Sequence, residues 1–315
     1  SRSSAASDVY KRQELRFKVP QGNNSWDDDI AQIYEDYNVY LIYKDLQRAD
    51  FNRSWTGISY GSGYEGQGCV NDEMTNYYVE FMKKHIFAYL NPPITSKVLP
   101  MYWYLGYNVY SKSVLEVGGV ILASWIVPIH ENYDGLDYWC TCMFGEDNPS
   151  DPYLIPTDRA LLDRRRKMIL APVLEKAVKA GNIIIPEEFE VGFDHVTNLI
   201  AGLGMEDDPN YYLTRGYPGS VNTYVFNSIS EPANNSYPPT NEETFIGYMH
   251  LSMYYNQARL AEVYPADKYP FLTEKFAFVQ KYLKDKYQID LEAIANGPED
   301  WDLPLPPIPE TPDEE

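Results

Sequence analysis

The chain has 315 residues, enough for one large domain or two smaller ones with a buried core. Its formal net charge is −20 at pH 7, from 46 acidic and 26 basic residues. Such a charge repels phosphate backbones and anionic lipid headgroups, so we expect no nucleic acid partner and no charge-driven membrane binding. No run of about 18 apolar residues occurs, and no transmembrane helix is predicted.

The two ends of the chain differ in composition from its middle. Residues 1–13, SRSSAASDVYKRQ, closely resemble translated sequencing-adapter read-through from the ends of metagenomic contigs. We therefore expect them to be non-native, and the true N-terminus with any signal segment to lie outside this sequence. Residues 298–315 are acidic and rich in proline, which predicts a disordered or extended tail. Residues 14–297 are expected to form a single domain.

In the first half, hydrophobic periodicity predicts two helices and three strands. In chain order these are a helix over 25–37 with Ser25 as its cap, a strand over 38–44, a surface loop over 51–71, a helix over 74–90, and two neighbouring strands over 98–110 and 114–127. The near-continuous apolar run of the last strand, VLEVGGVILASWIV, indicates a strand covered on both faces. His85 falls on the apolar face of its helix, which favours a core histidine bonded to a backbone carbonyl over a ligand.

The second half is predicted to be mainly helical. Helices are expected over 157–181 with Thr157 as N-cap, over 240–257 with a capping box of Thr240 and Glu243, and over 271–294; residues 202–240 are loop-like. The apolar residues Leu162, Ile169, Val173, Ala177 and Ala180 predict one buried face for the helix over 157–181. Pro172 lies in the middle of that helix, where it removes a backbone hydrogen bond at a cost of roughly 3 kcal/mol.

Four segments carry a family resemblance through their order and spacing. They are EDYNVYLIYK at 35–44, LEVGGVILASW at 115–125, TNEETFIGYMHLSM at 240–253 and FLTEKFAFVQKYLKDKYQIDLEAI at 271–294. Together they resemble a family of extracytoplasmic lipoproteins from Bacteroidetes-type bacteria described as zinc-binding metallopeptidases. The resemblance implies a zincin-like α+β fold, with a mixed β-sheet and helices in the first half and a mainly helical second half.

The motif of that family, H-E-x-x-H, is missing here. In the motif, two histidines four residues apart share one helix face and bind Zn²⁺, while the glutamate between them polarises the metal-bound water. Counting back from IPEEF at 185–189 places the motif on Pro172, Val173 and Lys176, to within a residue. No register between 168 and 180 supplies a histidine. We therefore predict no catalytic residue and no bound metal.

Other residues offer weaker candidates for metal binding. Glu175 is the one acidic residue near the motif position, and Glu242, Glu243 and His250 lie on the later helix. Glu243 and His250 are separated by about 10.5 Å along a helix axis, too far for both to bind one ion. Glu242 and Glu243 are favoured as first-turn residues that the helix dipole stabilises. The cysteines Cys69, Cys140 and Cys142 form no disulfide framework and no convincing zinc site, so we expect them to be structural or incidental.

Three functions are compatible with these residues. The first is a non-catalytic, metallopeptidase-like cell-surface lipoprotein, a pseudoenzyme with a binding or assembly role and no cofactor. For it, the resemblance implies an outer-membrane location through an N-terminal lipid anchor outside this sequence, and partners among outer-membrane nutrient-uptake components, glycans or peptides. The second is an active zinc metallopeptidase with a displaced or non-standard metal site. The third is a structural interaction scaffold whose tail at 298–315 contacts a partner.

Overall fold

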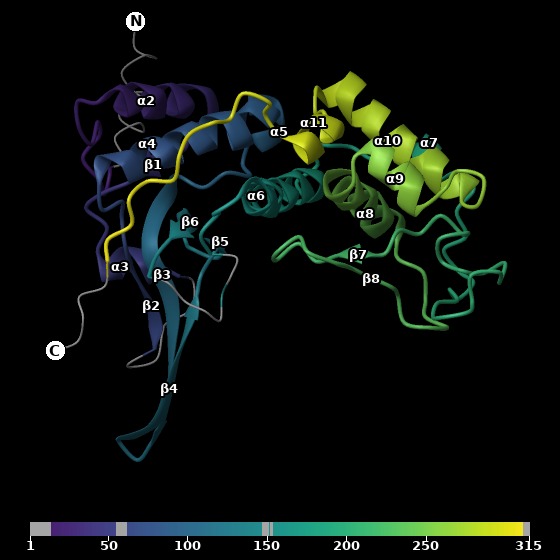
Figure 1. Cartoon of the computed structure of the whole chain (residues 1–315), viewed down its shortest axis with the longest axis horizontal. Coiled ribbons are helices and arrows are strands. Elements are labelled where there is room, and N and C mark those ends of the chain that lie inside the picture. Colours follow the sequence, from purple (N-terminus) through teal and green to yellow (C-terminus); the bar gives the residue numbers. More distant parts are fainter. Residues whose placement is uncertain (1–13, 55–61, 147–150, 152–153, 311–315) are drawn as a thin grey trace, which may run out of the picture. The chain divides into compact units, whose positions relative to one another are not determined.

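The structure is a computed structural model that describes residues 14–54, 62–146, 151 and 154–310 (Figure 1). The segment at 1–13, predicted to be non-native, lies outside the described residues. The chain divides into two compact units, which are described separately. The first unit holds the chain up to residue 79, residues 101–146 and the chain from 308, and the second holds residues 80–100 and 147–307.

The first unit is built on the mixed β-sheet that was expected. Its strands are β1 (Tyr40–Ile42), β2 (Gly63–Gln67), β3 (Tyr102–Val117), β4 (Val120–Pro128), β5 (Glu131–Asn132) and β6 (Tyr138–Phe144). Its helices are α2 (Ser25–Tyr37), α3 (Arg48–Phe51) and the first turns of α4 (Asp72–Phe81). Strands β1 and β6 run parallel to β3, whereas β2 and β4 run antiparallel to it and β5 pairs antiparallel with β6.

Strand β3 is the centre of this sheet, because four strands pair with it. Its first half pairs with β1 and β6, and its second half pairs with β2 and β4. A strand has only two hydrogen-bonding edges, so β2 must follow β1 along one edge while β4 follows β6 along the other. At the change-over, the register with β6 shifts between Gly106 and Tyr107. A side chain at Gly106 would meet Val109 at 2.6 Å, so only glycine fits this close approach.

The prediction that residues 114–127 are covered on both faces is wrong. Strand β4 is exposed along almost its whole length, with Val120 and Leu122 each 60% exposed. The two predicted strands do pair as neighbours, in antiparallel direction, but β3 continues to Val117. The two-residue turn lies at Gly118 and Gly119, which both have positive φ and which the prediction placed inside the second strand. Figure 1 shows this hairpin extending away from the rest of the sheet. Among the described strands, β1 and β6 are buried at every residue, and β6 was not predicted from the sequence.

Several local details of the first half also differ from expectation. Strand β2 lies in the stretch predicted as a loop over 51–71, whose residues 55–61 are outside the described part. Helix α2 is capped by Asn24 in a capping box with Asp27, not by Ser25. The helix predicted over 74–90 begins as α4 but continues as a π-helical turn at Met82–Ile86 and a 3-10 turn at Phe87–Tyr89.

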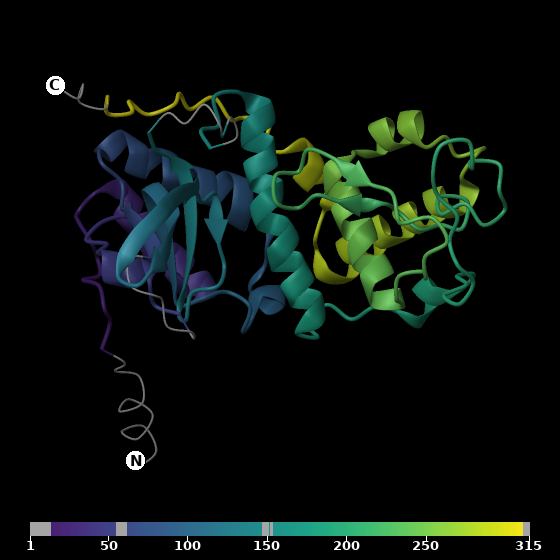
Figure 2. The ribbon, with the colours of Figure 1, turned by 90° about the horizontal axis from the view of Figure 1, so that it is seen from below.

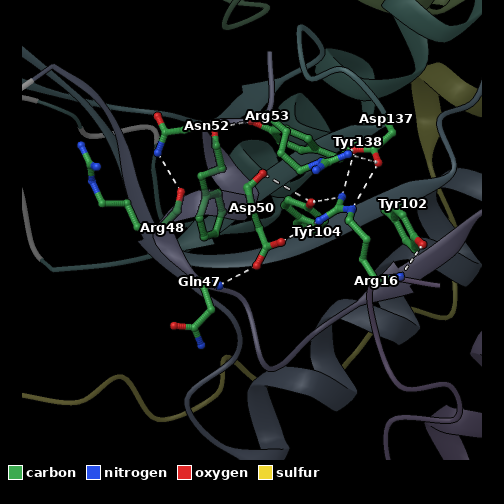
Figure 3. Close-up of polar contacts among 11 residues, drawn as sticks. Arg16, Gln47, Arg48, Asp50, Asn52, Arg53, Tyr102, Tyr104, Asp137 and Tyr138 are labelled. Atoms are coloured by element: carbon green, nitrogen blue, oxygen red, sulfur yellow. Dashed lines mark hydrogen bonds and ion pairs between the residues drawn. The ribbon is translucent and has the colours of Figure 1, made fainter. Parts of the chain in front are cut away.

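Arg16 ties the start of the described chain to the sheet of the first unit (Figure 3). Its guanidinium donates to Asp50 at 2.6 Å, to Asp137 at 2.9 Å and to the Tyr104 hydroxyl at 2.8 Å. The Arg16 backbone N–H donates to the Tyr102 hydroxyl at 3.1 Å. The side chains of Arg16, Asp50 and Asp137 are all less than 25% exposed. Removing the guanidinium would therefore leave Asp50 without its cation, while Asp137 would keep its ion pair with Arg53 at 3.3 Å.

The second unit is mainly helical, as expected for the second half (Figure 2). Its helices are α5 (Pro92–Thr95), α6 (Arg159–Lys179), α7 (Glu187–Glu190), α8 (Asn241–Tyr254), α9 (Gln257–Val263), α10 (Pro270–Tyr287) and α11 (Leu291–Asn296). Two short strands, β7 (Ser220–Val221) and β8 (Ile229–Ser230), pair in the loop-like region. The helix predicted over 271–294 is interrupted at Gln288, which adopts the left-handed conformation and separates α10 from α11.

Helix α6 is the core helix of the second unit, and two expectations about it need correction. Its N-cap is Asp158, whose side chain accepts from the Leu161 N–H, and not Thr157. The single buried face is also wrong, because from Met168 to Leu174 every residue except Pro172 is buried. The physical reason is that α6 packs against α5, α8, α11 and the π-helical turn, so several of its faces are covered at once.

The tail runs as extended chain from 301 to 310, without helix or strand. Trp301 packs edge-on against the ring of His85, with ring centroids 4.6 Å apart, and Pro306 is buried. Residues 311–315 lie outside the described part.

We predict that Arg16→Gln lowers the free energy of unfolding by about 1–3 kcal/mol, because Asp50 and Asp137 keep their charge but lose their shared donor. Arg48→Gln is the matched control, since its ion pair with Glu65 is at the surface, with Arg48 51% exposed, and should be worth less than about 1 kcal/mol. Urea unfolding of both variants followed by circular dichroism measures the difference. Equal losses would contradict the role given to Arg16.

Candidate functional site

The structure places the three predicted motif positions on α6, and none of them lies in the wall of the two cavities of the second unit described below. Val173 is fully buried, Pro172 is partly buried and Lys176 is exposed. A proline ring and a valine side chain carry no atom that binds a metal ion, and an ammonium brings like charge toward one. The face of α6 that borders a cavity is formed by Glu175 and Lys179 instead.

That cavity, the α6–α8 pocket, has a volume of about 300 Å³, and all four weaker candidates for metal binding lie in its wall. Its wall is formed by Glu175 and Lys179 of α6, by Pro218, Gly219, Ser220, Val221 and Thr223 around β7, and by Pro239, Glu242, Glu243, Thr244, Ile246, Gly247 and His250 at and in α8. Sequence reasoning singled out Glu175, Glu242, Glu243 and His250 one by one. It missed Lys179 and the β7 residues, which carry no motif and reach the pocket only through the packing of the chain.

Glu175 is the central charged group of the α6–α8 pocket. Its carboxylate accepts from Lys179 Nζ at 2.9 Å, and its other oxygen lies 3.6 Å from His250 Nε2. The hydrogen bond to Glu175 raises the pKa of Lys179. Burial lowers the pKa of His250 despite the nearby Glu175 carboxylate, so its imidazole is neutral at pH 7. His250 Nε2 is buried and makes no hydrogen bond to the described residues, which leaves it available to a ligand.

Glu242 and Glu243 have the helix-start role that the sequence predicted and border the pocket as well. Thr240 caps α8, its hydroxyl accepting from the Glu243 N–H at 3.2 Å and donating to the Glu243 carboxylate at 3.1 Å. Both glutamates lie in the first turn, where the helix dipole favours negative charge. The pocket therefore contains three carboxylates against one ammonium.

The residues present do not fit a zinc ion. Among residues 14–54, 62–146, 151 and 154–310, no three His, Cys, Asp or Glu side chains are grouped so that they could hold a metal. Zinc sites take three or four such ligands at about 2.0–2.3 Å. In the α6–α8 pocket, Glu175 and His250 are neighbours, but Lys179 already occupies one oxygen of Glu175. What the pocket offers is a polar, acidic wall suited to hydrogen bonding and to a cationic group.

A larger cavity of about 680 Å³ lies between α9, α10 and α11. Its polar groups bond to one another: Gln257 Nε2 donates to Gln280 Oε1 at 2.8 Å, and Glu292 accepts from the Gln257 N–H at 2.9 Å. It contains none of the residues singled out from the sequence. Volume alone therefore favours this cavity, whereas available charge and an open imidazole nitrogen favour the smaller pocket.

His85 is a core histidine, as expected, but its partner is a guanidinium and not a backbone carbonyl. Arg166 Nη1 lies 3.1 Å from His85 Nδ1, and both side chains are buried. Because a guanidinium can only donate, Nδ1 must accept and the ring carries its hydrogen on Nε2. Burial first, and then the positive charge of Arg166, lower the pKa of His85 to about 2.

The segment at 130–134 has the sequence H-E-x-x-D, which resembles a metal-binding motif only if it is helical. Glu131 lies in strand β5 instead and accepts from the Thr141 hydroxyl at 2.6 Å, so no helix forms there.

The described residues include no helix that is long and apolar enough to cross a membrane.

We predict that His85 makes folding sensitive to acid. The unfolded chain takes up a proton near pH 6.5 but the folded protein only near pH 2, so the folded state loses stability as the pH falls below 6.5. The free energy of unfolding that His85 removes approaches about 1.4 kcal/mol for each pH unit below 6.5. In His85→Gln, whose amide oxygen can still accept from Arg166, the free energy of unfolding should fall less steeply between pH 7 and pH 4. Carboxylates titrate equally in both proteins, so parallel curves would contradict the assignment.

Comparison with known proteins gives one structural relative at low identity. No protein-family model matches the chain, and no curated protein matches its sequence. Among solved structures, the chain is similar to the crystal structure of a putative zinc-binding metallo-peptidase from Bacteroides caccae, with a TM-score of 0.43 and 12% sequence identity. The match covers 87% of this chain and 92% of that chain. The finding is thus a structural resemblance to a metallopeptidase described as zinc-binding.

Proposed function

We propose that this protein is a non-catalytic, metallopeptidase-like binding protein that holds a positively charged group of a peptide in the α6–α8 pocket. The observation that carries the proposal is the wall of that pocket. There Glu175 faces the open Nε2 of His250 at 3.6 Å, and Glu242 and Glu243 border the same space.

The charge of the pocket favours a cationic ligand. Three carboxylates stand against the single ammonium of Lys179, and His250 is neutral at pH 7. An incoming ammonium can replace Lys179 beside Glu175, because the Lys179 side chain is 57% exposed and can turn toward water. Charge-assisted hydrogen bonds to carboxylates are roughly twice as strong as neutral ones.

The same wall favours a peptide over a neutral glycan. None of its described residues is Phe, Tyr or Trp, although the chain contains 29 tyrosines. A neutral sugar would meet carboxylates and small side chains there, without an aromatic face to stack on. A peptide amine or a lysine side chain brings the positive charge that those carboxylates lack. A pocket of about 300 Å³ accommodates one such group and not a long chain.

The cellular setting belongs to the proposal and rests on the family resemblance of the sequence. We propose an outer-membrane lipoprotein on the extracytoplasmic side, anchored by a lipid on a segment outside this sequence. Its partners would be components of a nutrient-uptake system, for which the protein would capture peptides. The excess negative charge of the chain is compatible with an aqueous surface location.

The binding proposal predicts that amine-bearing peptides bind and that their acetylated forms do not. Isothermal titration with lysine-containing dipeptide amides, with and without acetylation of both amines, measures this directly. Glu175→Gln should weaken binding by roughly tenfold or more, since it removes a charge-assisted hydrogen bond worth about 1.5–3 kcal/mol. Glu274→Gln, an exposed glutamate of α10 outside the pocket wall, is the matched control. Equal affinity for acetylated and free peptides would overturn the proposal.

The alternative is an active zinc peptidase with a displaced site, and the closeness of Glu175 and His250 is the observation that favours it. Elemental analysis of the purified protein distinguishes the binding protein from the peptidase, because stoichiometric zinc would support the peptidase. We expect no zinc in the native protein. We expect zinc in the triple variant Glu175→His, Lys176→Glu, Lys179→His. These substitutions place H-E-x-x-H at 175–179, with both histidines on the face of α6 that borders the pocket.

The register predicted from sequence supplies the control for that experiment. Pro172→His, Val173→Glu, Lys176→His places a glutamate at the fully buried Val173 and two histidines at positions outside the pocket wall. It should bind no zinc and should unfold more easily, because a buried, unpaired carboxylate costs several kcal/mol. Zinc bound by this second variant and not by the first would show that the family motif belongs at the register predicted from sequence and not beside the α6–α8 pocket.

A further inference from the structure

The hairpin formed by β3 and β4 carries a group of large apolar side chains in water. Eight of them are 46–60% exposed: Leu115, Val117, Val120, Ile121, Leu122, Trp125, Ile126 and Val127. Single exposed apolar residues are ordinary, but a contiguous group of this size marks an interaction surface. Between Ser111 and Pro128 the chain contains one lysine and one glutamate, so the hairpin has no net charge.

The strand register separates the hairpin into two different faces. Residues paired across the strands point to the same side, and successive residues alternate. The pairs Ser111–Val127, Ser113–Trp125, Leu115–Ala123 and Val117–Val120 form one face. The pairs Lys112–Ile126, Val114–Ser124 and Glu116–Ile121 form the other, and Leu122 is the extra residue where the register shifts. Both charged residues therefore lie on the second face, and the first, which we call the uncharged face, has none.

The area of the uncharged face matches a small specific interface. Its large side chains Leu115, Val117, Val120, Trp125 and Val127 together expose on the order of 500 Å². Two such faces packed together would bury about 1,000 Å², the lower limit for a specific protein–protein contact. The Trp125 ring, 52% exposed, is the kind of residue that dominates such contacts.

Charge and backbone geometry decide which partner fits. The chain carries a net charge of −20, so most of its surface repels a second copy, and the hairpin is where two copies can meet without adding like charge. A lipid bilayer fits less well. Beyond Lys112, β3 pairs with β4, and on its other edge the Val114 N–H donates to the Ser62 hydroxyl at 3.2 Å. Among the described residues β4 pairs only with β3, which leaves the backbone groups of its other edge without a strand partner. Open sheet edges are not tolerated in a hydrocarbon layer.

We propose that the hairpin is the contact between two copies of this chain, with the uncharged face of one copy packed on the uncharged face of the other. The same patch on both copies makes a closed two-fold dimer, in which Trp125 of each copy lies against the valines and Leu115 of its partner. The second face, with Lys112 and Glu116, stays in water. Each copy uses its uncharged face in this two-fold contact, so the face is not available to a third copy and the contact closes at a dimer.

Sedimentation equilibrium of the full chain at micromolar concentration tests the proposal. We expect a monomer–dimer equilibrium whose dissociation constant falls as salt rises from about 0.05 to 0.5 M, because salt screens the repulsion between the two negative copies. The double variant Val117→Thr, Val120→Thr keeps the branched shape that strands favour, and should raise the dissociation constant at least tenfold. The matched control Ile121→Thr, Ile126→Thr changes two residues of similar exposure on the other face and should raise it less than threefold.

Three outcomes would overturn the proposal. A monomer at every concentration and salt would remove it, with circular dichroism confirming that the protein is folded. Equal weakening by both double variants would show that the uncharged face is not the contact. Co-sedimentation of the native protein, but not of Trp125→Ser, with zwitterionic phosphatidylcholine vesicles in place of dimer formation would assign the hairpin to a lipid surface.

Discussion

The sheet of the first unit depends on one strand, because β3 is the only described strand that pairs with four others. Its sixteen residues pass from a half that is covered on both sides, Tyr102 to Tyr107, to a half whose last three residues are exposed. Two edges cannot hold four strands at one level, so the partners are divided along the length of β3. The exposed hairpin follows from this arrangement, since β2 reaches only as far as Lys112 and β4 alone continues beyond it.

How much could be predicted from the sequence depends on how local each feature is. The cap of α8 at Thr240 and the pairing of two neighbouring strands were predicted, because their signals lie within a few residues. The turn at Gly118 and Gly119 was not, since both glycines were placed inside a strand over 114–127. The exposure of β4 was not, since an apolar run looks the same whether another layer covers it or not. Strand β6 was missed although YWCTCMF is rich in strand-forming aromatic residues. At the site, each of Glu175 and His250 could be named, but their 3.6 Å separation depends on how α6 packs on α8.

Helix α6 shows why a proline can persist in a core helix. Eleven residues of α6 are buried, including Ile169, Leu170 and Leu174. Burying each large apolar side chain stabilises the fold by about 1.5–3 kcal/mol, so a few of them offset the roughly 3 kcal/mol cost of Pro172. The same packing constrains function. Positions buried on all sides cannot present a ligand group to solvent, and in the wall of the α6–α8 pocket α6 contributes Glu175 and Lys179.

The α6–α8 pocket and the hairpin respond to salt in opposite directions, although both belong to one chain. The α6–α8 pocket gathers carboxylates, so its affinity for a cation decreases when salt screens the attraction. The hairpin is uncharged on its contact face, while the repulsion between two copies of a −20 chain decreases with the same salt. Salt therefore weakens the first interaction and strengthens the second. Because the pocket and the hairpin lie in different compact units and share no residue, a salt series separates them in the unmodified protein, and a change in dimerisation cannot be mistaken for a change in the pocket.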